Sequence, residues 1–167
     1  MKMGFEHIKR LSLNPYMMSK IIQSFLEGYN APVDIKLLFY VLPIVLNKDS
    51  RDRLLDARST SKIDSLFGKK ENYDVHEGLK LSGKANLAGF IDRYIELKIL
   101  TKESIIILVN ENKIIINNSV ILIEKDNYSN YSNKNIKETL RASFYLGVIF
   151  KKSSIEHLDN YLGVKSS

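Results

Sequence analysis

The sequence predicts a mainly α-helical fold of the α+β class, with a small β-hairpin or three-stranded wing. Apolar residues recur at spacings of three and four in several segments, and helix-capping residues stand before those segments. Isoleucine-rich runs separated by asparagines, between residues 105 and 123, are typical of strands joined by hairpin turns. The length of 167 residues suits a single domain, residues 1–167.

Helices are expected throughout the N-terminal part, residues 14–58. Asn14, followed by a proline, is suited to begin the first helix, whose apolar stripe runs to residue 29. Asp34 is suited to cap the second helix, residues 35–46, in which ten of the twelve residues are apolar. Because this second helix has no polar face, we expect it at the centre of the fold.

A winged-helix-like unit is expected over residues 62–123. Before it, a short helix at 49–58 points its arginines outward, and the unit itself opens with a helix at 62–67 that Gly68 ends. A longer helix, residues 82–100, then precedes the strands. The strands are expected at residues 105–109, 113–116 and 120–123. The side chains of the longer helix that we expect to be buried are Leu87, Phe90, Ile91, Tyr94, Ile95 and Leu97.

The C-terminal part is predicted to be a linker followed by two helices. Residues 124–135 are rich in Asn, Ser and Tyr without a period, which is typical of a surface linker. The C-terminal helices lie within residues 136–163 and end at Gly163. Tyr128 and Tyr131 of the linker have two interpretations, an interface with another protein or simple decoration of a loop.

Composition excludes several kinds of chemistry. The absence of cysteine excludes disulfides, thiolate zinc sites, iron–sulfur clusters and cysteine nucleophiles. The eight glycines are never clustered, so the chain is not a P-loop ATPase, and the three histidines have no paired spacing. We therefore expect no catalytic site, no metal and no cofactor. No signal peptide or membrane span is recognisable, and we expect a cytoplasmic location.

Two charged clusters have alternative interpretations. Asp49, Asp52 and Asp56 share one helical face, and Asp64 is close to them in sequence. These carboxylates could hold magnesium in the active site of a cryptic nuclease. The arginines that interleave with them favour a solvated helix with salt bridges instead. The C-terminal basic residues either contact phosphate or form a solvated helix face. These candidate phosphate contacts are Lys134, Lys137, Arg141, Lys151 and Lys152.

The order of several blocks resembles the middle component of bacterial three-component ABC systems. The resemblance is a pattern of hydrophobic blocks, and of turn and capping residues between them, that spans nearly the whole chain. It rests on residues 13–15, 25–29, 37–46, 49–53 and 61–68, and on the closing blocks 142–147, 154–158 and 162–164. The linker at 126–135 departs from the pattern, because it is unusually rich in Asn, Ser and Tyr.

The resemblance implies a non-catalytic adaptor subunit of a hetero-oligomer. Such a subunit works beside an SMC-like or Rad50-like ABC ATPase and an effector, often a nuclease, in anti-phage and anti-plasmid systems such as Lamassu. It would couple DNA sensing to activation of the effector, and its winged-helix character would serve protein docking. The expected partner-binding patch surrounds two short helices and comprises Arg51, Arg53, Lys62, Phe67, Lys69 and Lys70.

The alternative is a winged-helix transcription regulator that binds DNA directly. The net charge of +6 favours contact with nucleic acid. However, Asp92 and Glu96 lie on the outward face of the helix that would enter the groove, where phosphates would repel them. The adaptor is therefore the preferred hypothesis, with DNA reached through the complex.

Overall fold

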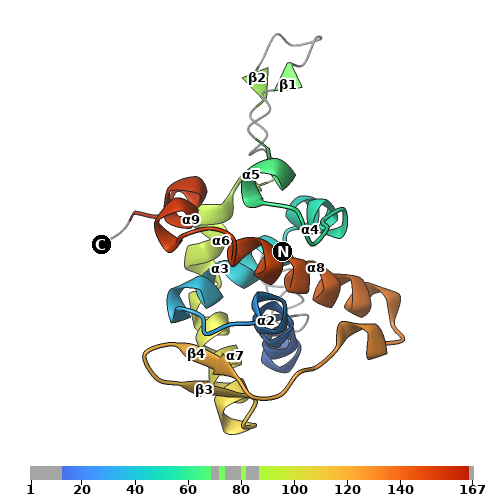
Figure 1. Ribbon diagram of the computed structural model, residues 1–167, viewed down its shortest axis with the longest axis vertical. Coiled ribbons are helices and arrows are strands. Elements are labelled where there is room, and N and C mark those ends of the chain that lie inside the picture. Colours follow the sequence, from blue (N-terminus) through green and yellow to red (C-terminus); the bar gives the residue numbers. More distant parts are fainter. Residues whose placement is uncertain (1–12, 69–71, 74–79, 82–86, 166–167) are drawn as a thin grey trace, which may run out of the picture.

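A computed structural model describes residues 13–68, 72–73, 80–81 and 87–165 of the chain. It is mainly helical and carries a small antiparallel hairpin, so the predicted fold class is confirmed. The two helices α2 (Pro15–Tyr29) and α8 (Lys134–Phe150) come from opposite ends of the sequence and cross near the centre of the molecule (Figure 1).

Two glycines allow α2 and α8 to touch through their backbones. A Cβ atom added to Gly28 would lie 1.8 Å from the carbonyl oxygen of Phe144, and one added to Gly147 would lie 2.1 Å from that of Phe25. These distances are far below van der Waals contact, so no side chain fits at either position. The close approach therefore depends on both glycines.

Two serines hydrogen-bond across the same helix pair. The hydroxyl of Ser24 on α2 donates to the carbonyl oxygen of Leu140 at 2.7 Å, and the hydroxyl of Ser143 on α8 donates to that of Ile21 at 2.6 Å. Both serines are buried, and each stands four residues before a contact glycine, one helical turn away. The serine bonds therefore reinforce the contact that the glycines permit.

Helix α3 (Ile35–Val45) lies beneath this pair, as its apolar sequence predicts. Its N-cap is Asp34, whose carboxylate accepts from the backbone N–H of Lys36 at 2.9 Å. Residues 40–42 and 44–45 are completely buried. Pro43 lies inside the helix, and its carbonyl oxygen accepts from the guanidinium of Arg93 at 2.8 Å. The central position predicted for this segment is confirmed.

A buried carboxylate joins the C-terminal helix α9 (Ile155–Leu162) to α3. Asp159 is 5% exposed and accepts from the Tyr40 hydroxyl at 2.5 Å and from the Lys36 ammonium at 2.6 Å. Burial and the bond to Asp159 raise the pKa of the Tyr40 hydroxyl well above its usual value, so the phenol stays protonated as a donor. Ser154 caps α9 and Gly163 ends it at φ 75°, as predicted.

The short helices near residue 50 form close to their expected positions. Helix α4 (Lys48–Leu55) begins one residue before the predicted 49, because Asn47 is its N-cap. Helix α5 (Ile63–Leu66) is followed by Gly68 at φ 81°. Beyond it, β1 (Asn72–Tyr73) and β2 (Lys80–Leu81) pair antiparallel.

The single helix predicted for residues 82–100 is wrong. Residues 82–86 lie outside the described part of the chain, and the next residues form two helices, α6 (Phe90–Glu96) and α7 (Lys98–Asn110), which Leu97 separates at φ −94° and ψ 3°. Gly89, at φ 77°, sets the start of α6. Ile91 and Ile95, expected in the core, are 39% and 62% exposed.

The first of the three predicted strands is also wrong. Residues 105–109 are the second half of α7, where packing against α2 overrides the β propensity of a run of branched side chains. The other two strands form the hairpin β3 (Ile114–Ile116) and β4 (Val120–Leu122), and Val33 pairs with Val120 on its far side. The expected wing is thus a hairpin, and its winged-helix character stays a prediction.

The predicted linker packs against the body of the molecule. It contains the 3₁₀ turn η2 (Tyr128–Asn130), and the Tyr128 ring meets Phe144 edge-on with centroids 5.4 Å apart. The Tyr131 hydroxyl donates to the Asp126 carboxylate, and the Lys20 ammonium lies 5.7 Å from the centroid of the Tyr131 ring. Both tyrosines therefore help to attach the linker to α2 and α8, and α8 begins at Lys134, two residues before the expected start.

Substitution of Gly147 by alanine tests the helix contact. We expect Gly147→Ala to lower the free energy of unfolding by about 3 kcal/mol, because backbone atoms of α2 must move away from the new Cβ. Gly163→Ala is the matched control, since its Cβ meets nothing within 4 Å and only the positive φ opposes it, at about 1 kcal/mol. Equal losses in urea unfolding would contradict the contact.

Substitution of Asp159 tests the attachment of α9. Asp159→Asn is expected to lower the free energy of unfolding by about 2 kcal/mol, because the Lys36 ammonium loses its carboxylate in a partly buried site. Asp52→Asn, which removes an ion pair with Lys48 on the exposed face of α4, is the control. Thermal unfolding that is equally affected by both substitutions would refute a special role for Asp159.

Candidate protein-binding surface

The arginines of the expected partner-binding patch are engaged within the chain. The Arg51 guanidinium donates to the carbonyl oxygen of Val45 at 3.0 Å, at the end of α3. Arg53 donates through two nitrogens to the carbonyl oxygen of Leu66, at 3.0 and 2.5 Å. Both side chains are half-buried, whereas the sequence pattern placed them outward. Their hydrogen bonds satisfy carbonyl groups at the ends of α3 and α5, where helices leave carbonyls without partners inside the helix.

The apolar anchor of that patch is not on the surface. Phe67 is 1% exposed, because α5 turns Ile63 and Leu66 into the core and Phe67 follows them. Its expected role as an exposed anchor is therefore wrong. Lys62 is exposed at the start of α5, and Lys69 and Lys70 lie outside the described residues.

The candidate phosphate contacts do not gather at one point. Lys134 and Lys152 stand at opposite ends of α8, about 27 Å apart along the axis. Lys134 pairs with Glu138 at 3.9 Å, and the Arg141 guanidinium lies 5.4 Å from the Tyr145 ring. Lys137 is exposed.

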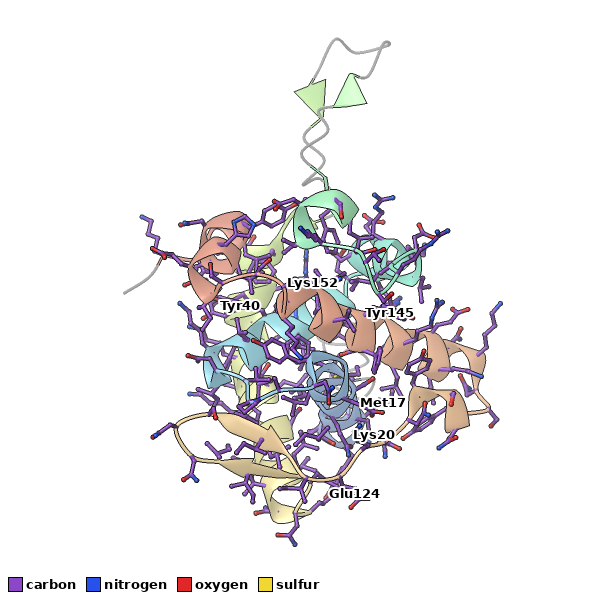
Figure 2. All side chains as sticks on the ribbon, in the orientation of Figure 1. Met17, Lys20, Tyr40, Glu124, Tyr145 and Lys152 are labelled. Carbon is purple, nitrogen blue, oxygen red and sulfur yellow. The ribbon has the colours of Figure 1, made fainter. Side chains whose placement is uncertain are left out.

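The two lysines after α8 link elements of the chain to one another. Lys151 donates to the carbonyl oxygen of Asn30 at 3.4 Å. Lys152, labelled in Figure 2, donates to that of Ser61 at 2.8 Å and also to that of Ser59. These cations thus bridge the end of α8 to the loops after α2 and before α5.

The aspartates near residue 50 do not form one cluster either. Asp52 pairs with Lys48 at 2.7 Å, while the carboxylate of Asp64 lies 3.1 Å from His157 on α9. Asp49 and Asp56 are exposed. In the part of the chain that the structure describes, no three His, Asp or Glu side chains converge as metal ligands would.

A small polar pocket lies between α2 and the hairpin. Its volume is about 120 Å³, and an ion pair between Lys113 and Glu124 at 2.7 Å crosses it. Gln23 donates to the carbonyl oxygen of Glu124 at 2.8 Å. Lys20 also lines the pocket, and a hydrogen bond with Tyr131 raises the pKa of its ammonium. Lys20 and Glu124 lie on the hairpin side of the molecule (Figure 2). These contacts fix the base of the hairpin to α2.

The most unusual surface feature is a concentration of exposed aliphatic side chains between residues 91 and 123. Apart from Tyr16 and Ile35, every large hydrophobic side chain that is strongly exposed in the described residues falls in this range. We call this set the isoleucine surface. Its members are Ile91, Ile95, Ile99, Ile106, Val109, Ile115, Ile116, Ile121 and Ile123.

The hairpin part of the isoleucine surface is apolar on both faces. Ile114 and Val120 point into the core, and are 2% and 0% exposed. On the opposite face Ile115 pairs directly with Ile121, and the two are 51% and 40% exposed. Strands that are apolar on both faces are typical of sheets that are covered on both sides. Here the chain itself covers one side.

The isoleucine surface is electrically balanced. Residues 91–125 contain five basic and five acidic side chains, although the whole chain carries +6. Large exposed apolar patches on a soluble protein mark sites of interaction with other proteins or with membranes. A balanced charge does not attract phosphate, so this surface suits a protein partner.

Sequence reasoning missed this surface because exposure is decided by tertiary packing. The signal was present in the run of branched residues at 105–109, which we assigned to a strand, and in the two-sided apolar hairpin. None of the described helices is both long and apolar enough to cross a membrane.

Fold and surface together define a small, mainly helical protein that exposes aliphatic side chains on α6, α7 and the hairpin. A family model described as ABC-three component (ABC-3C) system Middle Component 3 matches residues 4–166. The chain therefore belongs to this family of middle components, as the sequence resemblance indicated. No curated protein and no solved structure matches it. Membership implies that the chain works with other subunits of a multi-component system.

Substitution of Arg53 tests its place in the structure. Arg53→Ala is expected to lower the free energy of unfolding by about 1.5 kcal/mol, because the carbonyl oxygen of Leu66 loses the two hydrogen bonds that Arg53 donates. Arg58→Ala, at an exposed position three residues past α4, is the control and leaves the melting temperature unchanged. A melting temperature that Arg53→Ala leaves unaltered would contradict the structural role.

Proposed function

We propose that this middle component is a non-catalytic adaptor that holds an SMC-like ABC ATPase and an effector in one complex. The single observation that carries the proposal is the isoleucine surface, which exposes aliphatic side chains on two helices and a hairpin. Family membership supplies the setting, a system of three components. An adaptor needs surfaces that bind proteins, and this chain offers one.

The adaptor would pass a signal from the ATPase to the effector. In this proposal the ATPase senses foreign DNA, the adaptor holds the effector against it, and the effector, often a nuclease, acts on phage or plasmid in the cytoplasm. Lamassu systems are the example that the sequence resemblance suggests. A winged-helix character of the unit at 62–123 would then serve docking of proteins rather than reading of DNA.

The structure gives direct DNA binding less support than the adaptor role. The basic side chains of α8 are spread along the helix, and two of them donate to backbone carbonyls of the same chain. Glu103 and Glu111 stand beside the exposed aliphatics of α7, where they would repel a phosphate backbone. The DNA-binding regulator remains the alternative that the following experiment separates.

Co-purification of the three components tests the adaptor role. When the tagged chain is co-expressed with the ATPase and the effector of its own system, we expect all three in one peak of size-exclusion chromatography with light scattering. When the chain is omitted, we expect the ATPase and the effector to separate, because the adaptor supplies their contact.

Two results would contradict the adaptor role. One is a complex of ATPase and effector that forms equally well without the chain. The other is a chain that binds neither component but binds DNA with an affinity that falls steeply with salt, as counterion release requires for direct phosphate contact. The second result would establish the DNA-binding alternative.

A further inference from the structure

Helix α7 carries aliphatic side chains on its exposed face as well as on its buried one. The buried face contains Thr101, Ser104, Ile105 and Leu108, and the hydroxyls of Thr101 and Ser104 donate to the carbonyl oxygens of Leu97 at 2.9 Å and Leu100 at 2.7 Å. The exposed face contains Ile99, at 72% exposure. An ordinary surface helix confines its branched aliphatics to the buried face. The outer face of α7 is therefore built for a contact of its own.

Four exposed residues of α7 form a stripe with the spacing of a helix–helix seam. Ile99, Lys102, Ile106 and Val109 follow one another at intervals of three, four and three residues, which places them on one face at about 100° per residue. Ile106 and Val109 are 56% and 40% exposed. We call these four residues the α7 seam. Alternating intervals of three and four are the pattern by which one helix packs along another.

Lys102 is the single charged member of the seam. No acidic side chain of the described residues forms an ion pair with it, whereas neighbouring Lys98 lies over the Tyr94 ring at 4.8 Å. A partner that covers the seam also covers the start of this side chain. The stem can be covered while the ammonium stays near the edge of the contact, and a carboxylate of the partner within its reach would complement its charge.

We propose that the α7 seam docks an amphipathic helix of another component of the same system, with an Asp or Glu of that helix opposite Lys102. This inference rests on the proposed adaptor function, because it requires that the chain has a protein partner. The partner helix would contribute aliphatic side chains against Ile99, Ile106 and Val109. Its carboxylate would fix the register of the pair, as single polar residues do in helix seams.

A second copy of this chain suits the seam less well. In a parallel pair of α7 helices, Lys102 would face Lys102 of the other copy, and like charges would repel. In an antiparallel pair centred between residues 102 and 106, Lys102 would face Ile106 of the other copy. Neither arrangement places a carboxylate directly opposite Lys102. Charge complementarity therefore favours a different protein.

Substitution of two seam isoleucines by serine provides the first test. Ile99→Ser with Ile106→Ser is expected to weaken binding of the ATPase or the effector, each purified separately, by about tenfold or more, because central aliphatics dominate an interface. Isoleucine and serine have similar helix propensity, so the melting temperature should stay the same. Tyr16→Ser with Ile35→Ser removes exposed apolar groups that are not on α7 and is expected to leave binding unchanged.

Reversal of the seam charge provides the second test. Lys102→Glu is expected to weaken the same interaction about tenfold, because two carboxylates would then meet. Substitution of the opposing acid on the partner helix by lysine is expected to restore it. Lys165→Glu, which reverses an exposed charge beyond α9, is the matched control and leaves binding unchanged.

The outcomes separate this inference from the adaptor role. Binding of a component by the wild-type chain and equally by the folded seam variants overturns the seam and leaves the adaptor intact. Binding of neither component by the wild-type chain overturns both. A wild-type dimer in light scattering that the serine variant converts to a monomer also overturns the proposal, since a second copy would then occupy the seam.

Discussion

The contact between α2 and α8 is the constraint on which the rest of the structure depends. Gly28 and Gly147 remove the side chains that would hold these helices apart, and Ser24 and Ser143 donate hydrogen bonds across the gap. This pair joins a helix from the N-terminal part of the chain to one from the C-terminal part. Helix α7 then packs on α2, α4 packs on α8, and α3 contacts both members of the pair. The hairpin is attached to the same helices, because Gln23 donates to the carbonyl oxygen of Glu124 and Val33 pairs with Val120.

The packing of helices around α2 and α8 explains why the isoleucine surface faces outward. Helix α7 meets α2 through a face that contains Thr101 and Ser104, whose hydroxyls are satisfied within the helix itself. Ile105 and Leu108 are also buried there, whereas Ile99, Ile106 and Val109 point away from it. The hairpin likewise buries one isoleucine face and exposes the other. Exposure here is a consequence of how the helices pack, and the proposed adaptor role rests on it.

The sequence predicts those parts of the fold that local signals determine. Asn14 and Asp34 cap helices where expected, Gly163 ends the last helix, and the hairpin forms around the asparagine turn. Features that depend on distant packing were not predicted. Phe67 is buried because α5 folds onto the core, and residues 105–109 are helical because α7 rests on α2. The helix contact did leave a signal, a serine four residues before a glycine in both α2 and α8, although the sequence does not show that these two motifs meet.

Solvent access to the isoleucine surface in the assembled complex tests the central claim most directly. Hydroxyl-radical footprinting, read by mass spectrometry, compares side-chain oxidation in the free chain and in the complex with the other two components. The account predicts that oxidation of Ile99 and Ile106 falls on assembly, while oxidation of exposed Tyr16 stays the same. Unchanged oxidation of both isoleucines, with protection confined to α4, α5 or the basic side chains of α8, would contradict it.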